Sequence, residues 1–431
     1  MAVSNPEIAI VGAGPSGCAL ACFLRQRGAE VIVFDNGKRP DLLVGESLIP
    51  AAIPLIQRLG IEEEVKRVSV VKPGATLLHA DGLRIDLGFK ATRGKAPGYA
   101  YNIPRPAFDT IIARRAKQLG VRFVHERAQL TRTENQHAVR EISLSNASLD
   151  AAGLSPDSHP SLLVDATGRT RLFARMLDIE SVRGNRNDTA YFAHFENCTN
   201  EEFPPGQIII TVLKQGWSWR IPLQGKMSVG VVLNQHAARL RGDSPQSRLD
   251  ATLRDEPLLA KCMAGATQIT NVKTYSNYQL LSTRGYGPGW VMVGDAFGFV
   301  DPMLSPGVFM ALESAVLLDQ NIGLNANHTP HLSLDRYCRD VTSWHAAWQE
   351  VIEYLYDGRL LQLYEAGKEI SANASIFSGN RFLDWYYRRL VRQLVSGVAT
   401  RSTFKRRMLK AGVEHLTDPE IKSSRLAVID S

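Results

Sequence analysis

The sequence has few cysteines, and no two of them have the spacing of a metal site. Its five cysteines are scattered through 431 residues without a C-x-x-C motif. An odd number without such spacing predicts reduced thiols in the cytoplasm, with neither a disulfide framework nor a bound metal. Cys18 and Cys22 lie four residues apart, so both should pack into the core from one face of a helix.

Long uninterrupted apolar runs, internal repeats and low-complexity tracts are missing too. The apolar stretch "EIAIVGAGPSGCALACFL" is broken by glycines and a proline, which argues against a membrane span. The chain opens on polar residues, so we expect no secretory signal. With 44% apolar residues it has ample material for a large core. These features predict a globular cytoplasmic protein.

The net charge is +7, and much of the excess lies near the C-terminus. Residues 380–410 hold nine Lys or Arg and one acid, Asp384. No nucleic-acid recognition motif accompanies this charge, so we expect no nucleic-acid partner. A solvated helical face and a docking surface for an acidic protein or peptide remain the two interpretations.

A glycine-rich motif near the N-terminus predicts a dinucleotide site. A β-type run, Ile8–Val11, leads directly into "GAGPSG"; a helix ending at Gly28 follows, and then the strand "EVIVFD". Such glycines allow a tight turn, close approach to a pyrophosphate and close helix packing, and an acid after the second strand binds ribose. The expected binding residues are Gly12, Gly14, Pro15, Ser16, Gly17 and Asp35.

A second motif indicates which dinucleotide is bound. In "GWVMVGDAFGFVDPMLSPGVFMALESAVLLD" a strand ends at Gly294-Asp295 and a long helix begins near Gly307. This resembles the FAD-binding motif of the class A flavoprotein monooxygenases, in which the acid holds ribityl hydroxyls and the helix dipole points at the flavin ring. "LLVDATGRTRLFAR" and "RPAFD" match two further motifs of that family. The resemblance adds Arg105, Gly294, Asp295, Gly307 and Val308 to the expected FAD-binding residues.

The segment "GESLIP", Gly45 to Pro50, narrows the resemblance to the flavin-dependent halogenases and their close relatives. In that branch the corresponding segment lies against the flavin, which implies the same for Glu46 and Ser47. Glu46 has a second interpretation, because a Gly-Glu-Ser sequence before an apolar run also serves to cap a helix.

Lys72, in "VVKPGATLLHADG", matches the catalytic lysine of halogenases that act on phenols and pyrroles. A desolvated ammonium would hydrogen-bond hypohalous acid and orient it toward an aromatic ring, and desolvation would lower its pKa. The alternative is that Lys72 extends from a strand end to the surface.

"GWSWRIPL" resembles the W-x-W-x-I-P signature of the same halogenases. Trp217 and Trp219 alternate along a strand, so they point to one face and form a continuous aromatic wall. In the family this wall separates flavin from substrate. An aromatic strand packed against a helix is the structural alternative.

The loop before the long helix departs from the halogenase pattern. This chain reads D-P-M-L-S-P-G-V from Asp301, and Pro306 replaces a serine or threonine of the family. Proline removes one backbone N–H and one hydroxyl from the place where halide would be held. The Pro-Gly pair instead resembles the aromatic hydroxylases of the superfamily.

We therefore expect an FAD-dependent monooxygenase that hydroxylates an indole or phenol through a flavin C4a-hydroperoxide, with halogenation using Lys72 as the alternative. Electrons would come from NAD(P)H directly or through a flavin reductase, and O2 would be the co-substrate. Glu46, Lys72 and His79 are candidates for polarising the substrate, and Trp217, Trp219 and Pro306 would shape its site.

Three further interpretations remain. The chain resembles, in size and in its GESLIP-type motif, the flavoprotein monooxygenases that hydroxylate a protein tryptophan during maturation of tryptophylquinone cofactors, as in quinohemoprotein amine dehydrogenase. That resemblance implies a peptide or protein substrate. The other two interpretations are an alkene reductase similar to the geranylgeranyl reductases and a flavin-binding protein without activity.

The expected fold is α/β, with a Rossmann-like FAD-binding domain interleaved with a β-sheet substrate domain. Residues 1–75, 100–170 and 280–325 would bind FAD, residues 76–99 and 171–279 would form a mixed or antiparallel substrate sheet, and residues 326–431 would be helical. The polar stretch after Thr133 predicts a hairpin and a surface loop.

Overall fold

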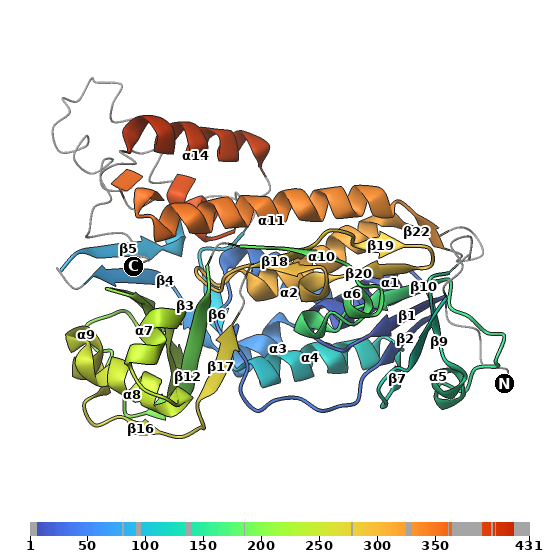
Figure 1. The fold of residues 1–431 in the computed structure, drawn as a ribbon, viewed down its shortest axis with the longest axis horizontal. Helices are drawn as coiled ribbons and strands as arrows, with labels where there is room; N and C mark the ends of the chain where they lie inside the picture. Colours follow the sequence, from blue (N-terminus) through green and yellow to red (C-terminus); the bar gives the residue numbers. More distant parts are fainter. Residues whose placement is uncertain are drawn as a thin grey trace.

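The computed structural model describes residues 7–79, 82–91, 96–133, 140–184, 186–276, 279–324, 330–360, 362–363, 390–397, 400 and 402–417. Figure 1 shows two sheet regions at opposite ends of an elongated molecule, with the long helix α11 (Leu334–Tyr356) running above both. Helices and sheets contribute to both ends, as the α/β prediction requires.

The first sheet carries the predicted dinucleotide motif and has the strand order β19-β20-β10-β1-β2-β7. Its five longer strands are parallel, and the short edge strand β19 is antiparallel. The parallel strands end at the same edge, where a doubly wound sheet binds its ligand. The strands are β1 (Ile8–Val11), β2 (Val31–Phe34), β7 (Arg122–Val124), β10 (Leu162–Asp165), β19 (Tyr286–Gly287) and β20 (Trp290–Met292).

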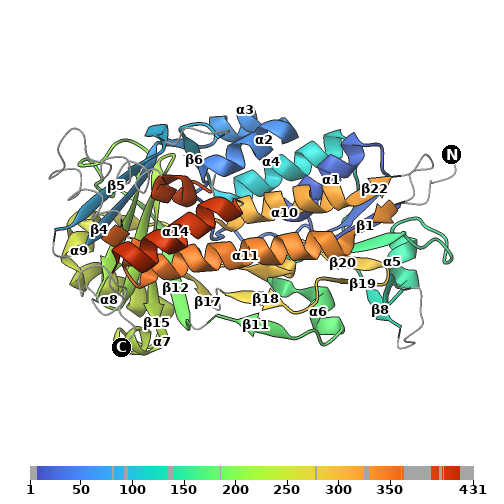
Figure 2. The same cartoon turned by 90° about the horizontal axis from the view of Figure 1, so that it is seen from above.

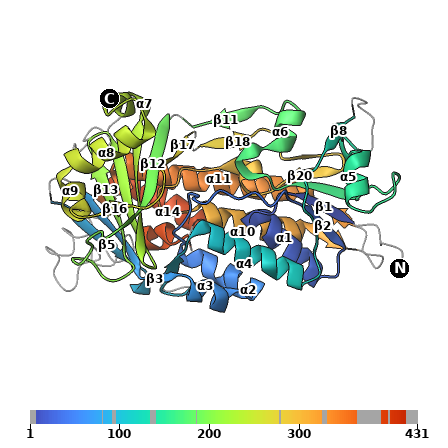
Figure 3. The ribbon, with the colours of Figure 1, turned by 90° about the horizontal axis from the view of Figure 1, so that it is seen from below.

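Three helices cover one face of this sheet (Figure 3): α1 (Pro15–Gln26), α4 (Arg105–Gln118) and α10 (Gly307–Asn321). Helix α1 begins three residues earlier than the sequence indicated, because Pro15 occupies a first-turn position that needs no N–H. Cys18 and Cys22 are fully buried in α1, which confirms their packing role.

The second sheet has the order β16-β12-β15-β14-β13-β4-β5, and β17 also pairs with β12. The pair β13–β4 is parallel and the others are antiparallel, so the predicted mixed sheet is confirmed. Its strands are β4 (Gly74–His79), β5 (Arg84–Gly88), β12 (Asp188–Glu196), β13 (Ile208–Leu213), β14 (Gly216–Leu223), β15 (Lys226–Asn234), β16 (Thr267–Gln268) and β17 (Lys273–Ser276).

Smaller sheets complete the described part of the fold. Strand β3 (Val70–Lys72) pairs with β6 (Ala100–Asn102), and β18 (Leu280–Ser282) pairs with β11 (Ser181–Arg183) and β21 (Gly298–Phe299). Two further pairs are β8 (Leu130–Arg132) with β9 (Ile142–Leu144), and β22 (Ile322–Leu324) with β23 (Pro330–Leu332).

The predicted loop after Thr133 is partly wrong. The hairpin forms as β8 and β9, but helix α5 (Asn146–Ala151) follows where a surface loop was expected. The Ser145 hydroxyl accepts a hydrogen bond from the backbone N–H of Ser148, which supplies the helix cap. A short polar helix of this kind has too few apolar positions to show a helical period.

The remaining helices lie mostly outside the sheets. They are α2 (Ile53–Leu59), α3 (Glu62–Arg67), α6 (Leu172–Met176), α7 (Gln235–Leu240), α8 (Pro245–Asp255), α9 (Pro257–Met263) and α14 (Thr403–Leu416), with 3-10 turns η1 (Pro50–Ala52), η2 (Phe89–Ala91), η3 (Gly168–Thr170) and η4 (Gly294–Ala296). Figure 2 shows α14 lying alongside α11. Most of the predicted basic helix beginning at residue 380 lies outside the described residues.

Within the described part of the chain, no helix combines the length and apolar character of a membrane span. The predicted division into FAD-binding and substrate parts stays a prediction. Strand β4 of the second sheet begins at Gly74, within the segment 1–75 that was predicted to bind FAD.

Candidate functional site

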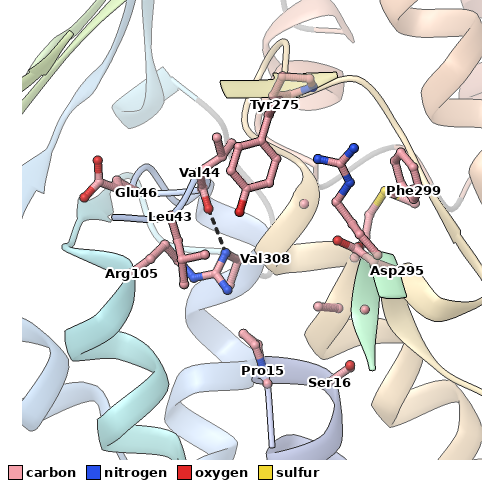
Figure 4. Close-up of a pocket in the computed structure, with 18 of the residues that line it drawn as sticks. Pro15, Ser16, Leu43, Val44, Glu46, Arg105, Tyr275, Asp295, Phe299 and Val308 are labelled. Atoms are coloured by element: carbon pink, nitrogen blue, oxygen red, sulfur yellow. Dashed lines mark hydrogen bonds between the residues drawn. The ribbon is translucent and has the colours of Figure 1, made fainter. Parts of the chain in front are cut away.

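A cavity of about 880 Å³ joins the two sheet regions. Its lining includes the glycine loop of the first sheet and the tryptophans of the second. In Figure 4, Pro15 and Ser16 lie below Arg105, and Asp295 lies on the opposite side of the cavity from Arg105. The expected dinucleotide residues and the expected aromatic wall therefore face one space.

The glycine loop leaves no room for larger side chains. A Cβ atom at Gly12 would lie 2.5 Å from the Ala166 carbonyl oxygen, and one at Gly17 would lie 2.1 Å from the Gly12 oxygen. Gly12 also has a φ of +105°, which side chains rarely adopt. Gly14 has no atom within 4 Å of the corresponding position, so its backbone is open to a ligand.

Two acids follow strands β2 and β20 of the first sheet. Asp35 lines the cavity after β2 and accepts a hydrogen bond from the Ala13 N–H at 2.9 Å, which fixes the glycine loop. Asp295 faces the cavity in η4, where removal from water raises its pKa to about 6 and Arg105 and Arg169 act in the opposite direction.

Arg105 ties the segment 43–47 to helix α4. Its Nη1 donates to the Val44 carbonyl at 2.9 Å (Figure 4), and its Nε donates to Asp109 at 3.1 Å. Gly45 has a φ of +96°, and a Cβ there would lie 2.8 Å from Arg105 Nη1. Val308 packs against the same point from the first turn of α10.

These residues fit FAD. The open N-terminus of α1 suits a pyrophosphate, Asp35 and Asp295 are placed for ribose and ribityl hydroxyls, and α10 begins at the cavity with Gly307. When bound, FAD would supply redox chemistry with O2 at this place. The individual contacts of the predicted residues remain proposals.

Glu46 does not cap a helix, and that interpretation is wrong. The helical turn after it is capped by Ile49 without a side-chain hydrogen bond. Glu46 is 2% exposed, and its carboxylate oxygens lie 2.9 and 3.0 Å from Nε2 of His194, which is equally buried. His194 lies on β12, and its Nδ1 has no hydrogen-bond partner among the described residues.

Lys72 is buried rather than extended to the surface, so the surface interpretation is wrong too. It is 1% exposed, and Nζ donates to Ser47 Oγ at 2.8 Å and to the Leu48 carbonyl at 2.9 Å. Burial lowers the pKa of Lys72 to about 7. Lys72 does not line the cavity itself, but Ser47 does, so the ammonium reaches the cavity through Ser47.

Trp217 and Trp219 form the predicted wall. Their ring centroids are 5.7 Å apart at 45°, and both rings line the cavity. Trp219 also packs against Phe192 at 5.6 Å. Gly230 lies opposite Trp219 on β15, where a Cβ would come within 2.3 Å of the indole ring. The wall therefore depends on a glycine in the neighbouring strand.

The wall is anchored to the loop before α10. Trp217 Nε1 donates to the Tyr356 hydroxyl at 2.8 Å, and that hydroxyl donates to Asp301 Oδ2 at 3.0 Å. Burial raises the pKa of Asp301 to about 6 and that of Tyr356 well above its ordinary value. The guanidinium of Arg186 lies 3.9 Å from the Tyr356 ring centroid.

The loop itself has unusual backbone conformations. Leu304 and Ser305 have φ values of 68° and 60°, and both line the cavity with Gly307. Pro306 is the N-cap residue of α10 and does not line the cavity, so its side chain does not face a substrate. Its effect on the site is the missing N–H at the start of the helix.

Sequence reasoning named Glu46, Trp217 and Trp219, which line the cavity, and Lys72, which reaches it through Ser47. His79 does not line the cavity. Sequence reasoning missed His194, Tyr356 and Asp301. One signal in the sequence could have found His194. It lies on the same face of a strand as the apolar residues Ala190 and Phe192, where a histidine stands out.

Comparison with known proteins agrees with this geometry. The tryptophan halogenase family matches residues 84–358, and an NAD(P)-binding Rossmann-like domain matches residues 10–41. Tryptophan 2-halogenase of Chondromyces crocatus is 30% identical over 320 residues, which cover 73% of this chain and 60% of that protein. The chain thus spans about 60% of the length of this relative.

The chain covers a larger share of other similar proteins. The 1H-pyrrole-2-carbonyl-[peptidyl-carrier protein] chlorinase of Pseudomonas fluorescens is 25% identical over 380 residues, covering 81% of this chain and 83% of that protein. A triple mutant of the flavin-dependent brominase Bmp2 has the same fold, with a TM-score of 0.74, 20% identity and coverage of 95% and 98%. The cavity, the FAD motifs and the family match lead to one conclusion: the chain belongs to the flavin-dependent tryptophan halogenase family and has its FAD-binding Rossmann fold.

Proposed function

We propose that this protein is an FAD-dependent oxidoreductase that halogenates an electron-rich aromatic ring. The observation that carries the proposal is the buried ammonium of Lys72, which is bound to Ser47 in the GESLIP segment, and Ser47 lines the same cavity as the tryptophan wall. A buried lysine without an acidic partner among the described residues is costly to maintain for packing alone, and perturbed groups of this kind concentrate at functional sites.

Lys72 has the donors that this chemistry needs. An ammonium has three N–H groups, and Ser47 and Leu48 accept two of them, which leaves one for an incoming oxygen. Reduced FAD and O2 would supply the oxidant that turns halide into hypohalous acid. Lys72, acting beside or through Ser47, would hold that acid by its oxygen and direct the halogen at the ring.

The wall and its neighbours support an aromatic substrate. Trp217, Trp219, Phe192 and Tyr275 give the cavity an apolar aromatic end, where a flat ring is desolvated and stacked. Some relatives act on tryptophan and others on a pyrrole held by a carrier protein. We propose a ring of the indole, pyrrole or phenol class, either free or carried on a polypeptide.

The test is product analysis of a Lys72→Ala variant. FAD-loaded protein is reduced and mixed with O2, chloride or bromide and a panel of indoles, phenols and pyrroles, and the halogen isotope pattern is read by mass spectrometry. The wild type should form a halogenated product, and the variant should form none while it consumes O2 at an unchanged rate. Failure of the wild type to halogenate any ring would overturn the proposal.

Hydroxylation is the second candidate, and Pro306 favours it. Proline leaves the start of α10 without the N–H and hydroxyl that would hold halide. A hydroxylase has no need for halide, and a tryptophan side chain within a polypeptide is one substrate it could take. A product that gains oxygen from O2 at a rate independent of halide would support this candidate over halogenation.

A further inference from the structure

The cavity has one carboxylate that the expected dinucleotide contacts do not use. The acids among its described lining residues are Asp35, Glu46, Asp109 and Asp295. The first and last are placed for FAD hydroxyls, and Asp109 is paired with Arg105. Glu46 lies against His194 instead, and Figure 4 shows its carboxylate pointing away from Asp295. This carboxylate is therefore available to a ligand other than FAD.

The partner of Glu46, His194, lies at the aromatic end of the cavity. It shares one face of β12 with Phe192, whose ring centroid is 5.6 Å from that of Trp219. On the neighbouring strand it pairs with Ser228, which lines the cavity and accepts the Trp219 indole N–H at 3.3 Å. The Glu46 carboxylate is thus held at the end of the cavity where an aromatic substrate is expected.

The hydrogen bonding of the pair leaves the carboxylate with capacity to accept more. Nε2 of His194 lies 2.9 Å from Oε2 and 3.0 Å from Oε1 of Glu46, so the imidazole donates a single N–H to it. A carboxylate has about four acceptor positions, and no other donor within the described residues reaches this one. His194 therefore fixes the orientation of a cavity-lining carboxylate without saturating it.

We propose that Glu46, positioned by His194, accepts the hydroxyl proton of the substrate, and that this substrate is a phenol. The inference rests on the proposed function and selects one of its three ring classes. When a carboxylate takes the proton of a phenol during attack, the ring gains phenolate character and becomes a far stronger nucleophile. The N–H of an indole or a pyrrole is much less acidic, so the same carboxylate assists those rings little.

The protons balance over one turnover. The phenol proton passes to Glu46 while the ring carbon takes the halogen of hypohalous acid, and the departing hydroxide receives a proton from Lys72. The halogenated ring then loses its own proton, which restores the Lys72 ammonium, and Glu46 returns its proton to the phenol oxygen. A phenol and hypohalous acid thus give a halophenol and water, and both side chains end as they began.

The first test measures binding and needs no turnover. Phenol and its methyl ether, anisole, are titrated into the oxidised, FAD-loaded protein by calorimetry. A hydrogen bond to the carboxylate should make phenol bind at least about tenfold more tightly, and Glu46→Gln should abolish that preference. Asp255→Asn, at an exposed acid that ends α8, is the control and should keep it. Equal binding in the wild type, or an unchanged preference in Glu46→Gln, would overturn the proposal.

Variants of His194 separate a positioning role from a merely structural one. His194→Gln keeps an N–H near the place of Nε2, whereas His194→Leu removes it. We expect the preference for phenol over anisole to survive in the first variant and to be lost in the second, with FAD bound equally well by both. The same preference in the two variants would contradict the role of His194.

The second test compares ring classes in turnover. Reduced, FAD-loaded protein is mixed with O2, bromide and either a phenol or a pyrrole. Glu46→Gln should lower bromination of the phenol at least about a hundredfold and that of the pyrrole by less than about tenfold. Equal losses would overturn the proposal, because Glu46 would then act on the flavin or the halide. A wild type that prefers phenol in binding but halogenates no ring would refute the proposed function alone.

Discussion

Trp217 donates its indole N–H to the hydroxyl of Tyr356 at 2.8 Å, although the two residues lie 139 positions apart in the chain. The same hydroxyl donates to Asp301, the first residue of the loop that leads into α10. One tyrosine at the end of α11 thus connects the aromatic wall with the loop beside the expected flavin ring. The position of the wall tryptophan therefore depends on two distant parts of the sequence, Tyr356 and Asp301.

Replacing Tyr356 with phenylalanine should destabilise the protein and loosen the wall. The substitution leaves the buried Trp217 N–H and the Asp301 carboxylate without their partner, which costs about 1–3 kcal/mol for each such group. We expect a lower free energy of unfolding and a red-shifted tryptophan emission. Tyr354→Phe is the control on the same helix, because that hydroxyl bonds only the more exposed Glu350. Equal effects of the two variants would show that the connection through Tyr356 is unimportant.

The sequence was informative where a function depends on one contiguous segment. Gly12, Gly14 and Gly17 act within six residues, so the strand, turn and helix around them could be predicted together. Trp217 and Trp219 are likewise two positions apart on one strand, and their common face follows from the pleat. For the same reason the FAD-binding half of the fold was predicted closely.

Contacts between distant segments could not be predicted. Glu46 and His194 are 148 residues apart, and nothing in either local sequence indicates the other. The second interpretation of Glu46, as a helix cap, came from its neighbours in the sequence, whereas the structure pairs it with His194 on β12. Tyr356 was missed in the same way, because its hydroxyl is one of several on an amphipathic helix.

The Glu46–His194 pair should be strongly coupled. Both side chains are nearly fully buried, so Glu46→Ala or His194→Ala leaves a buried polar group without its hydrogen-bond partner, which costs about 1–3 kcal/mol. The double variant should cost less than the sum of the two single variants. Urea unfolding of all four proteins measures this coupling, and the exposed pair Arg254–Asp255 is the control. Additive costs at Glu46 and His194 would contradict the prediction.

Lys72 should make stability depend on pH in a definite direction. Its pKa of about 7 in the folded protein lies below its ordinary value of 10.5, so between these values the unfolded chain binds more protons. Stability should therefore rise with pH across that window, by up to about 1.4 kcal/mol per pH unit. Lys72→Met should remove this rise, while Lys66→Met, at an exposed position on α3, should leave it unchanged. A slope that persists in Lys72→Met would show that other groups cause it.

Gly230→Ala should displace Trp219 from the wall. The added methyl carbon would lie 2.3 Å from the indole ring and 2.6 Å from Phe192 Cβ, so at least one ring must move. We expect a loss of about 1–3 kcal/mol of stability together with the loss of product formation. Gly88→Ala is the control, since nothing lies within 4 Å of that position. Unfolding midpoints and product yields check both variants, and equal behaviour of the two would show that the strand accommodates the methyl group.

Pro306→Thr should change the use of halide. The substitution returns a backbone N–H and a hydroxyl to the N-terminus of α10, where the helix dipole favours an anion. If the native loop holds halide weakly for want of these donors, the variant should reach half-maximal halogenation at a lower chloride concentration. Pro302→Thr is the control in the same loop, because that residue lies outside the helix, although it lines the cavity and Pro306 does not. Measuring product formation against chloride concentration separates the two candidate functions. The wild type could form only oxygenated product while the Pro306→Thr variant begins to halogenate. That result would assign hydroxylation to the native protein and identify Pro306 as the reason.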